Sequence, residues 1–196
     1  MISKFSQWIT KHMIKEQIIS EHDFDLYHYG WFVLLSDVFT LSFCLVVGAI
    51  FKILLPSALF YIVFYFAHRY AGGVHVKTEL HCQIITLLFF FISILSIKYI
   101  VINNLIILVS MYLICAVVLI ILSPADTPQK PLTKKERLLF KKITVCIITF
   151  SFILLLILHI KKMQLYSNAI FIAVILQTIS VICGRLFNKR LSIESA

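Results

Sequence analysis

Six apolar runs separated by short polar stretches constrain the fold of this 196-residue chain more than any other feature. They cover residues 31–51, 57–67, 83–97, 99–122, 143–160 and 165–183. Hydrophobic residues make up 61% of the chain and charged residues 14%, whereas a soluble domain has about 45–50% and about 25%. The pattern therefore excludes an ordinary soluble domain and predicts an all-α, polytopic helical membrane bundle, organised as one integral membrane domain over residues 1–196.

The second and third apolar runs are too short to cross a membrane by themselves. They contain 11 and 15 residues, and a bilayer of ~30 Å needs about 20. Both adjoin the polar stretch 68–82, which lies between them. Each run either extends as a helix into that stretch or enters the membrane without crossing it.

The first 28 residues differ from the apolar runs and contain several charged side chains. The charges predict that this segment is not a cleavable signal peptide. Plotted at 100° per residue, one side carries an apolar stripe with lysines along its border, which is typical of an interfacial amphipathic helix; a solvated tail is the alternative. The stripe consists of Ile2, Phe5, Trp8, Ile9 and Met13.

The basic residues predict the orientation in the membrane. The segment 123–142 contains six of them, so it is expected to be a cytoplasmic loop. With six spans, 14 of the 18 Lys and Arg residues lie on the same side as this loop. Both termini and the polar stretch 68–82 are therefore predicted to be cytoplasmic. This topology accounts for the net charge of +9 without a nucleic-acid partner.

The polar stretch 68–82 contains three of the seven histidines and Cys82. Ionisable groups at membrane depth are costly and usually functional. His75 and Cys82 would share a face of a helix but stand about 10.5 Å apart along its axis, so a working pair requires a bend or an unwound turn. An imidazole can activate a thiol as a nucleophile. The alternatives are an interfacial histidine beside a packed thiol, or, less favoured, a metal site, because the spacing matches no common zinc signature.

Further polar residues give secondary expectations. Glu79 is predicted either to orient the His75 imidazole or to face the lipid headgroups. Backbone amides near Gly72 and Gly73 are candidates for stabilising an oxyanion. Asp37, within the first apolar run, requires a polar partner such as Arg69, a place near the headgroups or a polar interhelical contact.

Three amides inside or beside the apolar runs are expected to form hydrogen bonds between helices. They are Asn103, Asn104 and Gln177.

Two separated motifs resemble the accessory gene regulator B (AgrB) family of bacterial membrane peptidases. The first is Arg69-Tyr70-Ala71-Gly72-Gly73-Val74-His75, followed by Cys82. The second is the proline-bracketed loop Ser123-Pro124-Ala125-Asp126-Thr127-Pro128-Gln129-Lys130-Pro131-Leu132. Chain length, span order and the position of the basic loop agree with the same resemblance.

The resemblance implies a cysteine endopeptidase in the bacterial cell membrane that needs no metal or cofactor. Its substrate would be a small AgrD-like precursor peptide, cut at the cytoplasmic face and cyclised to a quorum-sensing thiolactone. Cys82 would be the nucleophile and His75 the general base, supported by Arg69, Gly72 and Gly73. Family members often carry a basic residue before the arginine, whereas this chain has His68.

Several partner assignments and two rival classes of function accompany this hypothesis. Lys130, with its basic neighbours, could attract an acidic part of the precursor, but membrane topology alone accounts for these residues and is the favoured explanation. Asp37 is a second candidate for substrate binding. Membrane lipids are expected partners, and a homodimer would give the short second and third runs protein neighbours. The rivals are a small peptide exporter or channel without covalent chemistry, and a membrane scaffold.

Overall fold

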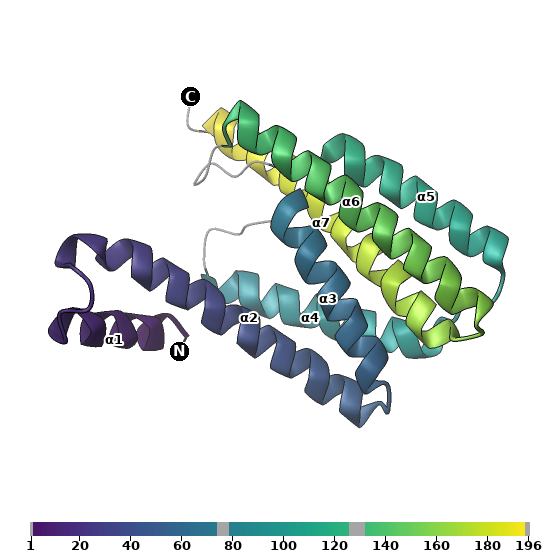
Figure 1. The fold of residues 1–196 in the computed structure, drawn as a ribbon, viewed down its shortest axis with the longest axis horizontal. Helices are drawn as coiled ribbons and strands as arrows, with labels where there is room; N and C mark the ends of the chain where they lie inside the picture. The colour runs from purple at the N-terminus through teal and green to yellow at the C-terminus, as the bar shows by residue number, and fades with distance from the viewer. Residues whose placement is uncertain (1, 74–78, 126–131, 195–196) are drawn as a thin grey trace. The chain divides into compact units, whose positions relative to one another are not determined.

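The structure is a computed structural model that describes residues 2–73, 79–125 and 132–194, and the side chains within these ranges except for 79–81 and 187–194. The described residues form seven α-helices and a short 3-10 helix, η1 (Glu21–Asp23) (Figure 1). The α-helices are α1 (Ile2–Lys15), α2 (Phe24–Ile50), α3 (Leu54–Ala71), α4 (Glu79–Tyr99), α5 (Leu105–Leu122), α6 (Lys134–Ile160) and α7 (Gln164–Glu194). The prediction of an all-α fold is confirmed.

The chain divides into two compact units, residues 1–43 and 44–196. In the first unit, α1 is tied to α2 by the Ser6 hydroxyl, which lies 2.8 Å from His28 Nδ1, and by the Trp31 indole, which donates to Met13 Sδ at 3.3 Å. Ser6 is buried, whereas Trp8 is exposed. The predicted N-terminal amphipathic helix is present, but its small polar residues face α2 and part of the expected apolar stripe faces outward.

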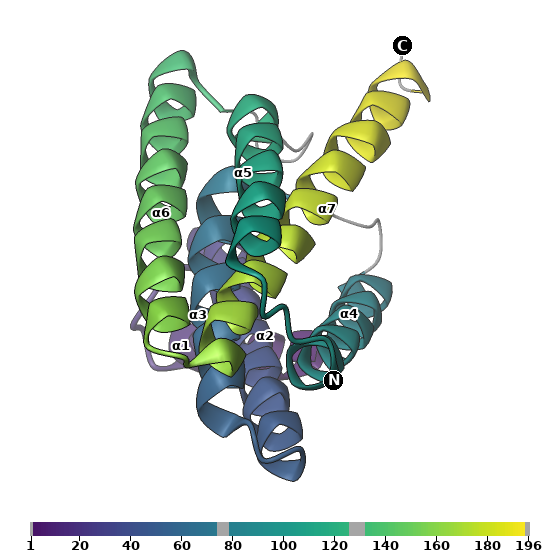
Figure 2. The ribbon, with the colours of Figure 1, turned by 90° about the vertical axis from the view of Figure 1, so that its right-hand side faces the viewer.

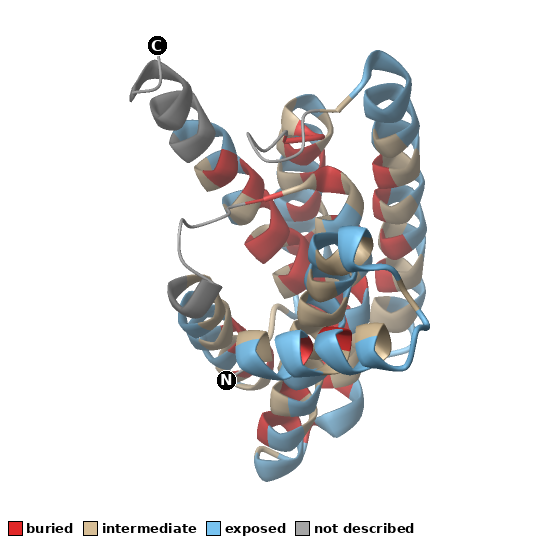
Figure 3. Cartoon of the chain, turned by 90° about the vertical axis from the view of Figure 1, so that its left-hand side faces the viewer, coloured by how far each residue is buried: buried red, intermediate tan, exposed pale blue. Residues whose placement is uncertain are grey.

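Helix α7 is the centre of the second unit and contacts α3, α4, α5 and α6 (Figure 2). Figure 3 colours much of this helix as buried, and many of its buried residues are small or apolar. Small residues allow helices to approach closely when no water drives their association. Ala169, Ala173 and Val174 are among these residues.

Side-chain hydrogen bonds join the helices of the second unit. The Asn168 amide on α7 donates to the carbonyls of Ile97 and Ile100 at the end of α4, at 3.1 and 2.8 Å. The Tyr112 hydroxyl on α5 donates to the Ile148 carbonyl on α6 at 2.8 Å. Burying polar groups in an apolar bundle is costly unless they are paired, so these bonds stabilise one arrangement of the helices.

Five helical stretches of the described chain are long and apolar enough to span a membrane. They are residues 21–50, 82–99, 105–122, 134–160 and 164–186. Large apolar side chains point outward, such as Ile106 at 77% exposure and Ile114 at 65%, where lipid tails rather than water are the natural neighbours. The protein is therefore a polytopic helical membrane protein, as predicted. Helix α3, which contains the second apolar run, is not among the five.

The two short apolar runs belong to helices that are longer than the runs themselves. Helix α3 has 18 residues and α4 has 21, which correspond to about 27 and 32 Å at ~1.5 Å per residue. Both runs are parts of continuous helices that take in residues of the polar stretch. This favours the extended alternative over re-entry, and it removes part of the reason for expecting a homodimer, which stays a prediction.

Two predicted boundaries are wrong. The run 99–122 is not one segment, because Asn104 Oδ1 accepts hydrogen bonds from the backbone of Ile106 and Ile107 and begins α5 there. Asn104 is therefore a helix cap rather than an interhelical hydrogen-bond former. The predicted loop 123–142 is helical from Lys134, because Thr133 and Glu136 form a reciprocal capping box.

Candidate active site

The polar stretch begins on the last turn of α3 and leaves that helix at Gly72. The Gly72 N–H donates to the His68 carbonyl at 3.0 Å, which ends the helix. The Gly72 N–H therefore serves as a helix cap in this structure. The expectation that backbone amides near Gly72 and Gly73 stabilise an oxyanion stays a prediction.

Gly72 has a backbone conformation that requires glycine. Its φ is 75° and its ψ is −172°, a region that other residues avoid because of their Cβ. A Cβ there would also stand 2.5 Å from the Ala125 carbonyl oxygen. Ala125 is held at this position because its N–H donates to the Ala71 carbonyl at 2.9 Å. The first glycine of the motif therefore lets the chain pass close to the segment after α5.

Gly73 is packed between two helices. A Cβ added there would collide with the His68 ring of α3 and the Ser180 hydroxyl of α7. Gly73 is buried in the structure. The second glycine is thus required by a close approach, a different reason from that at Gly72.

A buried amide connects this segment to α7. Gln177 has no exposed surface. Its Nε2 donates to the Gly72 carbonyl at 2.7 Å, and its Oε1 lies 3.1 Å from His68 Nδ1. The expectation that Gln177 forms a bond between helices is confirmed. His68, which departs from the family pattern, also has a definite partner here.

The described part of the first motif and the first residues of the second lie together in the structure. The backbone bond from Ala125 to Ala71 joins the segment after α5 to the end of α3. The rings of Tyr70 and Phe140 pack edge to face with centroids 5.7 Å apart, which brings the first turns of α6 to the same place. The peptide bond between Ser123 and Pro124 is cis.

Cys82 is the fourth residue of α4 and is partly exposed. The Cys82 carbonyl accepts a hydrogen bond from Thr86 Oγ1 at 2.9 Å. All five cysteines are free thiols.

Of the remaining predicted site residues, the structure describes some and not others. His75 and Lys130 lie outside the described residues, and so does the side chain of Glu79, although its backbone begins α4. Arg69 is exposed and donates to the Tyr65 hydroxyl at 2.8 Å. Asp37 lies in α2 within the first unit. The pairing of Asp37 with Arg69 and the roles of His75, Glu79 and Lys130 stay predictions.

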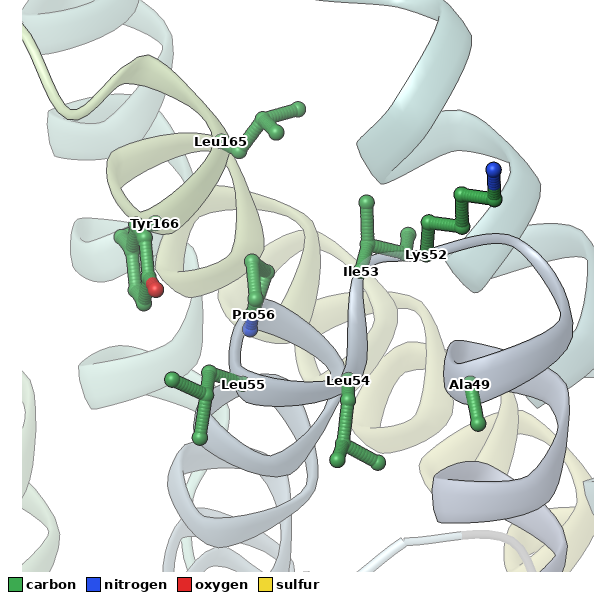
Figure 4. A pocket seen from close by; sticks show the side chains of 8 residues that line it. All are labelled: Ala49, Lys52, Ile53, Leu54, Leu55, Pro56, Leu165 and Tyr166. Carbon is green, nitrogen blue, oxygen red and sulfur yellow. The ribbon is translucent and has the colours of Figure 1, made fainter.

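Other possible sites are distinct from this one. Within the described ranges, no three His, Cys, Asp or Glu side chains are grouped to hold a metal ion. A cleft of about 480 Å³ lies at the beginning of α3 and is lined mainly by apolar side chains, among them Ile53, Pro56 and Leu165 (Figure 4). Gly72 follows the opposite end of the same helix, about 27 Å away, so the cleft is not part of the candidate site.

Sequence reasoning identified the motif residues but not how they are held. It treated the two motifs as separate signals and did not predict the bond from Ala125 to Ala71 or the packing of Gly73 against Ser180. The signal for α7 was Gln177, an amide within an apolar run. Its partners could not be inferred, because they are more than 100 residues away in the sequence.

The fold and the site together define a class: a multi-pass helical membrane protein in which a glycine ends one helix before a polar stretch that contains a cysteine in its sequence. The family model for accessory gene regulator B matches residues 3–181, nearly the whole chain. The chain therefore belongs to the accessory gene regulator B family and is a membrane component of a quorum-sensing system. Searches among curated proteins and among solved structures gave no match.

Proposed function

We propose that this protein is a membrane cysteine endopeptidase that cuts a small AgrD-like precursor peptide and promotes its closure to a thiolactone. The observation that supports the proposal best is the meeting of the two motifs at Ala71 and Ala125, next to the paired glycines. That contact holds the chain in place at Ala71 to Gly73, directly before the sequence segment that contains His75. Membership of the family supports the same substrate class.

The proposed reaction begins at the Cys82 sulfur. His75 takes the thiol proton, and the thiolate attacks the scissile carbonyl of the precursor. The carbon–nitrogen bond then breaks, the leaving amine takes the proton from the His75 imidazolium, and an acyl thioester remains on Cys82. A cysteine thiol of the bound peptide attacks this thioester, the thiolactone closes, and its proton returns to the Cys82 sulfur by way of His75.

Water exclusion decides which product forms. Exchange of one thioester for another changes the bond type little, whereas hydrolysis is strongly downhill, so the site must keep water from the intermediate. A cysteine in the first turn of an apolar helix is suited to this requirement. Residues 82–99 of α4 have the composition of a membrane span.

We further propose that the site faces the cytoplasm. Arg69 and the basic first turns of α6 lie at the same end of the second unit, because Tyr70 contacts Phe140. Lys52 lies at the opposite end of this unit. It lines the same cleft as Leu165 and Tyr166, which belong to the first turn of α7. Basic residues are concentrated on the cytoplasmic side of membrane proteins, so the more basic end supports the predicted orientation.

The test is capture of the acyl intermediate. Purified protein in lipid nanodiscs is mixed with a synthetic precursor whose internal cysteine is replaced by serine, which slows ring closure. Mass spectrometry is expected to find the peptide fragment attached to Cys82. Cys82→Ala should abolish the adduct and the cleavage. Cys146→Ala is the matched control, because it removes an exposed thiol of α6 and should leave both unchanged.

Two outcomes would overturn the proposal. If Cys82→Ala cleaves the precursor at the normal rate, Cys82 is not the nucleophile. If the unaltered protein moves precursor across the membrane without cleaving it, the exporter hypothesis is correct instead.

A further inference from the structure

Gln177 is the side chain by which α7 holds the segment that leaves α3. We propose that Gln177 is a positioning residue for the reaction: it fixes the Gly72 carbonyl, and Gly72 precedes His75 by three residues in the sequence. This inference rests on the proposed function and adds a residue from a helix that carries neither motif. Gln177 is completely buried, where an unpaired amide is strongly unfavourable.

The hydrogen bonds show which way the Gln177 side-chain amide is oriented and which ring nitrogen of His68 carries a hydrogen. The Gly72 carbonyl can only accept, so the Gln177 nitrogen must face it, as it does at 2.7 Å. The Gln177 oxygen then faces His68 Nδ1 at 3.1 Å. Since that oxygen can only accept, Nδ1 of His68 must carry a hydrogen.

The contacts at Gly72 make the bond from Gln177 a restraint on position. The Gly72 N–H is bound to the His68 carbonyl, and its own carbonyl is bound to Gln177. The preceding carbonyl of Ala71 accepts from Ala125, and the following residue, Gly73, fits closely between α3 and α7. Ala71, Gly72 and Gly73 are thus held by contacts with α3, α7 and the segment after α5. They directly precede residues 74–82, which contain the proposed catalytic pair.

The His68 ring takes part in the same group of contacts as Gln177 and Gly72. It stacks on Phe64 with centroids 5.2 Å apart and an interplanar angle of 17°. A phenylalanine at position 68 could keep this stacking while removing the donor to Gln177. Substitutions at His68 and Gln177 therefore act on one shared hydrogen bond, which a double-mutant cycle can detect.

The experiment compares Gln177→Met with Thr178→Val in nanodiscs. Methionine keeps an unbranched side chain but cannot bind the Gly72 carbonyl. Thr178 is the neighbouring residue of α7. Its hydroxyl donates to the Val174 carbonyl of its own helix at 2.7 Å and to the Cys115 carbonyl of α5 at 3.4 Å, and neither acceptor belongs to the two motifs. We expect Gln177→Met to lower kcat for precursor cleavage about tenfold or more with little change in KM, because misplacement by about 1 Å can cost ~100-fold. Thr178→Val should leave both constants unchanged.

Hydrogen exchange measures the restraint without the reaction. Gln177→Met is expected to accelerate deuterium uptake in peptides that cover residues 67–73, whereas Thr178→Val should not. In the kinetic cycle, adding His68→Phe to Gln177→Met should lower kcat by less than about twofold further, because both changes remove one interaction.

The outcomes separate this inference from the proposed function. Unchanged exchange in Gln177→Met would overturn the restraint, whether or not the protein is a peptidase. Faster exchange with an unchanged kcat would overturn the positioning role. A rise in KM with a matching fall in kcat/KM and an unchanged kcat would assign Gln177 to substrate binding and also overturn the positioning role. If the unaltered protein forms no Cys82 adduct, the proposed function and the positioning role both fail, and the exchange result still decides the restraint.

Discussion

Replacing Gly72 by alanine tests the physical reason for the glycine pair. The φ of 75° and ψ of −172° place Gly72 in a region that is nearly exclusive to glycine, and an alanine there costs about 1–3 kcal/mol in backbone strain. The new Cβ would also stand 2.5 Å from the Ala125 carbonyl oxygen. The segment after α5 must then move, which breaks the hydrogen bond from Ala125 to Ala71.

The total effect follows from these two contributions. Loss of the backbone bond adds about 1 kcal/mol, so Gly72→Ala should destabilise the protein by about 2–4 kcal/mol. For a chain of this length, 1 kcal/mol corresponds to about 2–4 °C in Tm. We therefore expect the apparent Tm to fall by about 5–15 °C, or, if the chain relaxes locally instead, the cleavage rate to fall sharply.

The matched control is Gly30→Ala. Gly30 lies within α2, and a Cβ there would meet nothing within 4 Å apart from its chain neighbours and the nearby backbone of its own helix. Alanine in a helix interior is favoured over glycine by roughly 0.5–1 kcal/mol, so this variant should be as stable as the original or slightly more so. The assay heats protein in detergent and measures the fraction that stays monodisperse on size-exclusion chromatography. Equal Tm values and equal cleavage by the two variants would refute the reasoning.

Three further changes test the packing of the helices and the place of α1. Tyr112→Phe removes the hydroxyl that bonds to α6 and should lower stability by about 1 kcal/mol; an unchanged Tm would show that this bond adds nothing. Asn168→Leu removes the donor to the end of α4 and should cost about 1–3 kcal/mol, seen as faster hydrogen exchange there. In a Trp31→Phe background, Trp8 is the remaining indole of two, and its emission should be blue-shifted and resistant to acrylamide in nanodiscs; a water-like, fully quenched emission would contradict an interfacial α1.

Side-chain chemistry close in sequence was the predictable part of the site. The pairing of a glycine doublet with His75 and Cys82 is visible in one short stretch, and so is the basic character of the segment that begins α6. The helix boundaries were less predictable, because capping depends on which backbone groups a side chain reaches. Asn104 illustrates this: it was expected to bond between helices and instead caps α5.

The sequence by itself determined that this chain crosses a membrane as helices and carries a polar, cysteine-containing segment between two of them. Its apolar runs leave few alternatives, because backbone groups in lipid must be paired within helices. Only the tertiary structure decided that Ala125 meets Ala71 and that Gln177 holds the Gly72 carbonyl. Those contacts join residues far apart in the chain, and local periodicity carries no information about which helices become neighbours.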